Sequence, residues 1–200
     1  MNTIFQEKVS KLESFEEILV GLDIGGTLVK LSVAVTKNIE KEIYGLLIER
    51  EFEEIVLEEN NLYIKKYHTS QFPFDVIDFL KLLKQKSSLS KINVTGGGAF
   101  KFNKLLNVNF FVIKEELKIN IEKRDELISL VKGYTFMNKY ETFYELKQGK
   151  IHFVKENQLV YPHIAVNVGS GISILIVNSP NEIRRETGTL IGGGKLFIHI

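Results

Sequence analysis

Four groups of glycines mark the residues whose types and spacing could do chemistry. In the first, residues 22–27 are Leu-Asp-Ile-Gly-Gly-Thr, and a lysine follows at position 30. The apolar run before the glycines predicts a buried strand that ends at the aspartate. Glycines permit a tight turn whose N–H groups face a phosphate, lysine adds positive charge, and aspartate can hold hydrated Mg²⁺. The candidate residues of this group are Asp23, Gly25, Gly26, Thr27 and Lys30.

The second and third glycine groups also follow short apolar runs. Gly96–Gly98 stands between a predicted strand and a predicted helix, where N–H groups and the helix dipole favour an anion. Three consecutive glycines exceed what a turn needs, so we favour close approach of a ligand, with Gly97 as a contact. Gly169–Gly171 joins two predicted strands, and the hydroxyl groups of Ser170 and Ser173 lie in and beside that turn.

A plain turn is the competing interpretation of these three groups. A β-hairpin explains the first and third, and a tight strand-to-helix turn explains the second. The fourth group, Gly188 with 192–194, follows Arg184 and Arg185, and a guanidinium fork suits a carboxylate or a phosphate. The acids at positions 125 and 126 begin a predicted helix, where their ordinary role is to complement the helix dipole.

Composition excludes several classes of protein. The chain has 200 residues and no cysteine, which rules out disulfides, Cys-ligated zinc and a thiol nucleophile. Its histidines show no metal-ligand spacing, and neither a Walker A loop nor a GxGxxG motif occurs. A formal net charge of +1 predicts no binding to nucleic acid or to a membrane surface. The most apolar run, 164–177, is too short and too polar to span a bilayer, so we expect a cytoplasmic protein.

The elements that must position these residues mix helices and strands, which predicts an α/β fold. No linker that would separate two domains is evident. We expect residues 51–60, which are rich in glutamate, to form a solvated loop. The predicted helices are 2–16, 73–86, 99–106 and 124–135. The predicted strands are 18–24, 29–35, 42–49, 62–67, 91–95, 143–146, 151–154, 163–168, 172–177 and 182–187.

Taken together, the motifs resemble those of the eukaryotic-type (type II) pantothenate kinases, within the actin/hexokinase/acetate-kinase superfamily. This resemblance implies an actin-like ATPase (ribonuclease-H-like) first lobe over 18–194, with a mixed sheet and flanking helices. A leading helical segment at 1–17 would precede it, and 195–200 would begin a second lobe that is missing. The matching stretches, in the family's order, are Asp23–Leu31, Thr95–Phe102, Asp125–Gly133, Tyr161–Leu175 and Arg185–Gly194.

The resemblance also implies an activity and its residues. The reaction is ATP-dependent phosphorylation of pantothenate to 4'-phosphopantothenate, the first step of coenzyme A biosynthesis, with Mg²⁺. Glu126 matches the catalytic base, while Ser173 and Arg185 match contacts to pantothenate. Asp23 would also hold Mg²⁺ through water. The residues that match contacts to the ATP phosphates are Asp23, Gly25, Gly26, Thr27, Lys30, Gly97, Gly169, Ser170 and Gly171.

Partners implied by the resemblance are pantothenate, acyl-CoA as a feedback inhibitor, and a second copy or a full-length homologue. Leu190 departs from the family, which has a serine there, and the family continues beyond residue 200. A catalytically inactive subunit that binds or modulates a full-length kinase is therefore the alternative function. A sugar or acyl kinase activity of another kind within the superfamily is a weaker alternative function. We expect the face toward the missing lobe to be apolar, which predicts poor solubility or oligomerisation.

Overall fold

The chain divides into two compact units, Met1–Lys123 (unit 1) and Arg124–Ile200 (unit 2). The predicted lobe over 18–194 includes parts of both. The predicted segments at 1–17, 99–106 and 195–200 lie outside the residues that the structure describes. The computed structural model describes residues 18–36, 41–57, 60–69, 72–97, 112–138, 143–154 and 160–192.

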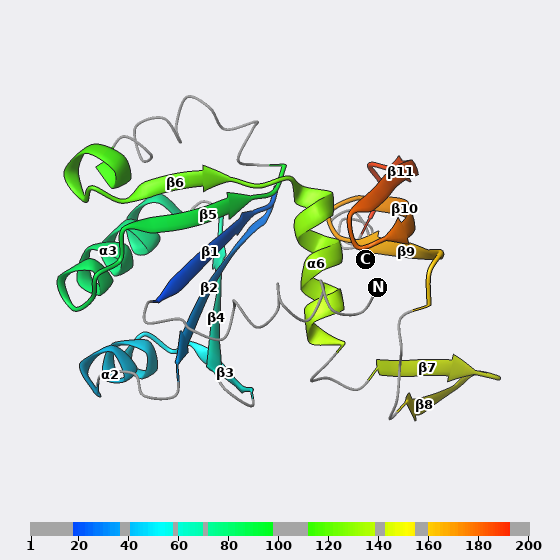
Figure 1. The fold of residues 1–200 in the computed structure, drawn as a ribbon, viewed down its shortest axis with the longest axis horizontal. Helices are drawn as coiled ribbons and strands as arrows, with labels where there is room; N and C mark the ends of the chain where they lie inside the picture. The colour runs from blue at the N-terminus through cyan, green and yellow to red at the C-terminus, as the bar shows by residue number, and fades with distance from the viewer. Residues whose placement is uncertain are drawn as a thin grey trace, which may run out of the picture. The chain divides into compact units, whose positions relative to one another are not determined.

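Unit 1 contains one mixed sheet of six strands in the order β3-β4-β2-β1-β5-β6 (Figure 1). The pairs β1–β2, β2–β4 and β4–β3 are antiparallel, whereas β5 joins the other edge of β1 in parallel and β6 joins β5 in parallel. Asp23 therefore lies on a strand that is paired along both edges. The strands are β1 (Leu19–Ile24), β2 (Leu28–Thr36), β3 (Glu53–Val56), β4 (Asn60–His68), β5 (Lys91–Thr95) and β6 (Asn120–Lys123).

The core of unit 1 lies between one face of this sheet and two helices, α2 (Lys41–Glu49) and α3 (Phe72–Gln85). Every second residue of β1 is buried, and β2 follows the same alternation. Because successive side chains of a strand point to opposite faces, the burial of Leu22 and Ile24 places Asp23 on the face away from these helices. A short π-helix, η1 (Val112–Glu116), adds Ile113 to the core.

Unit 2 contains the helix α6 (Glu126–Met137) and the three-stranded antiparallel sheet β11-β10-β9. Val131 of α6 is fully buried with Leu175 and Val177 of β10, so the helix packs on one face of this sheet. A separate hairpin is formed by β7 (Phe143–Lys147) and β8 (Lys150–Val154). The strands of the larger sheet are β9 (His163–Val168), β10 (Ile172–Ser179) and β11 (Glu182–Thr189).

The mixed α/β class is confirmed, and the predicted strands and helices in the described residues are confirmed with small shifts of their ends, except for two segments. The predicted strand at 42–49 is wrong: the segment is α2, because Ile43, Leu46 and Leu47 lie at helical spacing and are buried together. The predicted loop at 51–60 is also wrong, since it contains the exposed edge strand β3. Two elements, η1 and β6, were not predicted. They are too short for a periodic pattern.

No helix in the described ranges is both long enough and apolar enough to cross a membrane.

Two buried tyrosines predict a loss of stability at alkaline pH. Burial, followed by a hydrogen bond in which Tyr63 donates to Glu54 (2.6 Å), raises the pKa of Tyr63 to about 12. Burial, followed by the charge of Asp75, raises the pKa of Tyr67 to about 12. A raised pKa stabilises the folded chain fully below the ordinary pKa of 10.0, and this stabilisation is lost as the pH rises through about 12.

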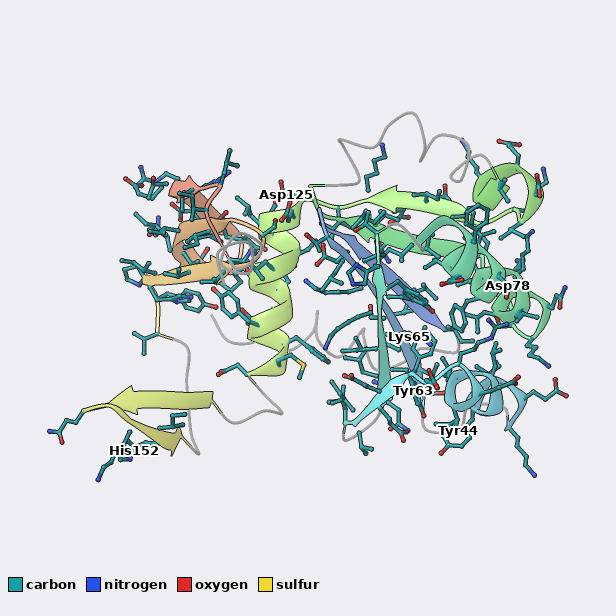
Figure 2. The ribbon with its side chains drawn as sticks, turned by 180° about the vertical axis from the view of Figure 1, so that it is seen from behind. Tyr44, Tyr63, Lys65, Asp78, Asp125 and His152 are labelled. Carbon is teal, nitrogen blue, oxygen red and sulfur yellow. The ribbon has the colours of Figure 1, made fainter. Side chains whose placement is uncertain are left out.

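We therefore expect the free energy of unfolding in urea to fall by about 3–5 kcal/mol over this pH range, because each of the two pKa values is raised by about two units. The free energy of unfolding of the Tyr63→Phe variant should fall by less over the same pH range. Tyr44→Phe, a change at an exposed position of α2 beside Tyr63, is the matched control (Figure 2). An identical pH dependence in the wild type and in Tyr63→Phe would contradict the prediction.

Candidate functional site

Asp23 lies in register between residues of two neighbouring strands, Lys30 of β2 and Thr95 of β5. Its Oδ2 accepts a hydrogen bond from Lys30 Nζ at 2.9 Å. The two side chains are 37% and 54% exposed, and ion pairs exposed to this extent contribute about 0–1 kcal/mol. Lys30 can therefore turn from Asp23 toward an anion at little energetic cost.

The turn from β1 to β2 is held by its own backbone and by the end of β4. The N–H of Gly25 donates to the carbonyl of Leu28 (2.9 Å), so it serves the turn rather than a ligand. The N–H of Thr69 donates to the carbonyl of Thr27 (3.0 Å) and ties the turn to the neighbouring strand. Gly26 and Thr27 are exposed, which makes them the accessible residues of the turn.

Gly96 brings the loop after β5 against the end of β1. Its φ of +97° is in the region that favours glycine, and a Cβ there would lie 2.5 Å from the carbonyl oxygen of Ile24. The same Cβ would lie 2.6 Å from Oδ1 of Asp23. Glycine is thus required at the position beside the aspartate, while Gly97, the predicted contact, is exposed next to it.

The environment of Asp23 fits a hydrated magnesium ion. Mg²⁺ keeps several waters and is held by one or two carboxylates, and Asp23 offers one partly exposed carboxylate beside a loop without side-chain bulk. Within the described stretches no cluster of three or more His, Cys, Asp or Glu could hold a metal directly. A metal here would therefore be bound largely through water.

In unit 2 the helix α6 begins at the predicted catalytic residue. Asp125 caps the helix, and its Oδ1 accepts a hydrogen bond from the N–H of Ile128 at 2.9 Å (Figure 2). This is the ordinary role of an aspartate at that position, and it fixes where the first turn starts. Glu126 is the first helical residue, and its side chain is exposed. The carboxylate of Glu126 is therefore accessible to a substrate.

The two predicted substrate contacts lie together on one face of the sheet in unit 2. Ser173 of β10 pairs in register with Gly188 of β11. A Cβ on Gly188 would collide with the guanidinium of Arg185, so this glycine leaves the room in which Arg185 lies opposite the serine. Ser173 and Arg185 share the face of Leu175, on which α6 packs. This face thus combines a hydroxyl, a guanidinium and the helix that carries Glu126.

The third and fourth glycine groups meet at the end of the same sheet. The N–H of Gly169 donates to the carbonyl of Gly171 at 2.8 Å, which closes the turn between β9 and β10. Cβ atoms on Gly171 and Gly192 would lie 2.6 Å from the carbonyl of Thr189 and 2.7 Å from that of Gly169, respectively. The chain after β11 therefore folds directly over the turn that holds Ser170, and Ser170 itself is exposed.

A partly buried pair of side chains, Tyr134 and His163, links α6 to β9. The hydroxyl of Tyr134 lies 2.6 Å from His163 Nε2, and His163 Nδ1 lies 2.9 Å from the carbonyl of Val160. Because a carbonyl only accepts, Nδ1 donates, and in the neutral ring Nε2 accepts the hydroxyl proton of Tyr134. Burial raises the pKa of Tyr134. This pair holds the helix of Glu126 against the strand that precedes the Ser170 turn.

The structure places the predicted residues in two groups, one in each unit. Unit 1 brings together Asp23, Lys30 and the turn at 25–27, with Gly97 following Gly96. Unit 2 brings Ser173 and Arg185 to one face and the turn at 169–171 to the end of the sheet. Sequence reasoning missed the packing roles of Gly96, Gly188 and Gly192. The sequence shows that these glycines occur in clusters. It does not show which backbone each glycine contacts, because that depends on strand register.

Comparison with known proteins agrees with these motifs. A sequence profile of the family described as Fumble matches residues 19–197. Pantothenate kinase 1 of Arabidopsis thaliana is 33% identical over 190 residues, which cover 88% of this chain and 45% of that protein. The Mus musculus protein named 4'-phosphopantetheine phosphatase is 29% identical over 195 residues, 88% of this chain and 23% of that protein. The chain thus spans less than half the length of these two relatives.

Among solved structures, the Aquifex aeolicus member of the Ppx/GppA protein family aligns with a TM-score of 0.48 and 14% identity. The alignment covers 92% of this chain and 54% of that one.

The close approach at Gly96 predicts opposite effects for two glycine substitutions in unit 1. Gly96→Ala should destabilise the fold by about 2 kcal/mol or more, because its Cβ meets backbone and φ is positive. Gly45→Ala, in the exposed face of α2 with nothing within 4 Å of its Cβ, should stabilise the fold by about 0.5–1 kcal/mol. Urea unfolding of both variants measures the difference. Equal free energies of unfolding for Gly96→Ala and Gly45→Ala would contradict the close packing at Gly96.

Proposed function

Because this chain belongs to the Fumble family of pantothenate kinase-like proteins, we propose that it binds ATP and pantothenate and phosphorylates the pantothenate primary hydroxyl. One observation carries the proposal: the guanidinium of Arg185 lies over Gly188, the register partner of Ser173, on the sheet face on which the Glu126 helix packs. A guanidinium suits the carboxylate of pantothenate, a hydroxyl suits its polar groups, and a carboxylate suits removal of a proton.

On the ATP side, the proposal uses the residues around Asp23. Lys30 leaves its exposed ion pair and places its charge on a phosphate oxygen, and the amides of Gly26 and Thr27 donate to the same group. The backbone of Gly97, which is exposed in the loop after β5, supplies a further donor. When bound through Asp23 and water, Mg²⁺ neutralises phosphate charge.

On the pantothenate side, Glu126 is the general base. Its carboxylate takes the proton of the primary hydroxyl as that oxygen forms a bond to the γ-phosphorus, and the bond from this phosphorus to the leaving oxygen of ADP breaks. Arg185 binds the substrate carboxylate, and Ser173 contributes a hydrogen bond. The Asp125 cap and the Tyr134–His163 pair position Glu126 by fixing both the start of α6 and its place on the sheet.

A second candidate is a catalytically inactive subunit that modulates a full-length kinase of the same family. Leu190 favours it, because this exposed leucine stands in the last glycine-rich motif where the resemblance leads us to expect a serine hydroxyl. The two candidates differ in whether the purified chain turns over ATP.

Turnover should depend on Glu126. We expect ADP release from Mg-ATP and pantothenate, and a fall in kcat of about 10²–10⁴-fold in Glu126→Gln with little change in substrate affinity. Glu116→Gln, the same chemical change at an exposed position of unit 1, should leave kcat unchanged. No turnover by the folded wild type, alone or with a full-length homologue, would reject the kinase and leave the inactive subunit.

Substrate affinity should depend on Arg185 and not on its neighbour. Arg185→Ala should raise the KM for pantothenate by about 10–100-fold, the effect of losing a charged hydrogen bond. Arg184→Ala is the matched control, because Arg184 pairs in register with Ile176 on the opposite face and binds Glu186 at 2.8 Å. Similar KM values for the two variants would contradict the assignment of Arg185.

A further inference from the structure

Two lysines stand opposite each other on the outer face of the unit 1 sheet, the face away from α2 and α3. Lys30 of β2 pairs in register with Lys66 of β4. Both lie on this outer face, because the residues that follow them, Leu31 and Tyr67, are buried in the core. Their side chains are 54% and 56% exposed, respectively. Cβ atoms of such a pair lie about 4.5–5.5 Å apart, so both ammonium groups can reach one ligand.

This pairing of two lysines is unfavourable for the fold by itself. Like charges directly opposite each other destabilise an antiparallel pair of strands. Lys30 is compensated by Asp23, since Lys30 Nζ lies 2.9 Å from Asp23 Oδ2. The Nζ of Lys66 lies 4.0 Å from Oε2 of Glu53, which is too long for a hydrogen bond, and Glu53 is 75% exposed, so this ion pair contributes little. Stability of the sheet therefore does not account for a lysine at position 66.

The preceding lysine of β4 has the structural role that Lys66 lacks. Lys65 lies on the opposite face of the strand, and its ammonium group donates to the carbonyl of Arg50, the residue that follows α2. Its Nζ also lies 3.9 Å from Oε2 of Glu51. Lys65 thus links β4 to the end of α2. Among the described residues, Lys66 has only its long contact with Glu53.

The end of β4 that carries Lys66 is held against the turn between β1 and β2. The N–H of Thr69, three residues after Lys66, donates to the carbonyl of Thr27 at 3.0 Å. Strand register places Asp23, Lys30 and Lys66 in one row across β1, β2 and β4. Two strand spacings separate the backbones of Asp23 and Lys66 by about 10 Å, with Lys30 between them. The row therefore presents one carboxylate and then two ammonium groups beside the exposed turn.

We propose that Lys66 is a second phosphate-binding lysine, which together with Lys30 binds two phosphoryl groups of one polyphosphate chain. This inference rests on the proposed function, in which Lys30 and the amides of Gly26 and Thr27 bind the phosphates of ATP. An anion between the two lysines replaces their mutual repulsion by attraction to the ligand, and Lys66 gives up only its long contact with Glu53. A chain of phosphoryl groups carries charge on each group, so it engages both lysines at once. The pair therefore selects a polyphosphate over a single phosphate.

Binding of inorganic triphosphate tests the role of Lys66 without nucleoside or pantothenate. We measure it by isothermal titration calorimetry at fixed ionic strength in the presence of Mg²⁺. Lys66→Gln should weaken the binding of triphosphate about tenfold, the effect of losing a charged hydrogen bond. Orthophosphate, which Lys30 alone can bind, should lose less affinity in the same variant. An equal loss for both anions would overturn the selection of a polyphosphate chain.

Lys91→Gln is the matched control for Lys66→Gln. Lys91 begins β5, lies on the same outer face of the sheet, and has a side chain that is 45% exposed. It is four residues from Thr95, the register partner of Asp23, which corresponds to about 13 Å along the strand. Lys91→Gln should leave the affinity for triphosphate unchanged. An equal loss in both variants would indicate attraction of the anion to positive charge in general and would overturn the proposal.

Unfolding in urea separates a binding role of Lys66 from a structural one. Because the two paired lysines repel each other, Lys66→Gln should unfold at a urea concentration no lower than that of the wild type. Lys65→Gln should unfold at a lower urea concentration, since it loses the link to the end of α2. A lower midpoint for Lys66→Gln with an unchanged affinity for triphosphate would assign Lys66 to the fold and overturn the proposal.

Failure of this inference and failure of the proposed activity give different results. Triphosphate binding that depends on Lys66, without turnover of ATP, keeps the inference and rejects the kinase. Turnover by a wild type whose affinity for triphosphate survives in Lys66→Gln keeps the kinase and rejects the inference. A folded wild type that binds no triphosphate also rejects the inference.

Discussion

At one glycine of unit 1 and one of unit 2, Gly96 and Gly192, backbone passes so close to its neighbours that no side chain fits between them. Gly96 lies against Ile24 and Asp23, and Gly192 lies against Gly169 and Gly171. These contacts determine where each candidate turn lies relative to the strand that carries it. The positions of the Asp23 carboxylate and of the Ser170 hydroxyl depend on these backbone contacts. Gly96 and Gly192 thus allow backbone to lie directly against backbone.

The two units divide the chemistry between them. Unit 1 offers a cation and backbone amides at the end of its central strand, a combination suited to phosphate. Unit 2 offers a guanidinium, a hydroxyl and an accessible carboxylate on the face that α6 covers, a combination suited to an acidic alcohol. Each unit has its own core, built in unit 1 on α2 and α3 and in unit 2 on α6.

Much of the fold could be predicted from the sequence, because β-branched runs ended by glycine are a strong local pattern. The strands at 18–24, 91–95 and 163–168 were predictable for this reason, and α3 because Pro73 begins a run of apolar residues at helical spacing. Segment 42–49 was mistaken for a strand, since Ile43, Leu46 and Leu47 indicate a helix only once their common burial is known.

The candidate residues were visible in the sequence, but their arrangement was not. Strand register places Ser173 opposite Gly188 and places Arg185 in the space that this glycine leaves.

The ion pair of Lys30 with Asp23 has a consequence for ligand binding. An anion that draws Lys30 away leaves a bare carboxylate, which then attracts a hydrated cation more strongly. A cation on Asp23 in turn releases Lys30 for the anion. If both ligands bind as proposed, each would raise the affinity of the loop for the other by the same factor.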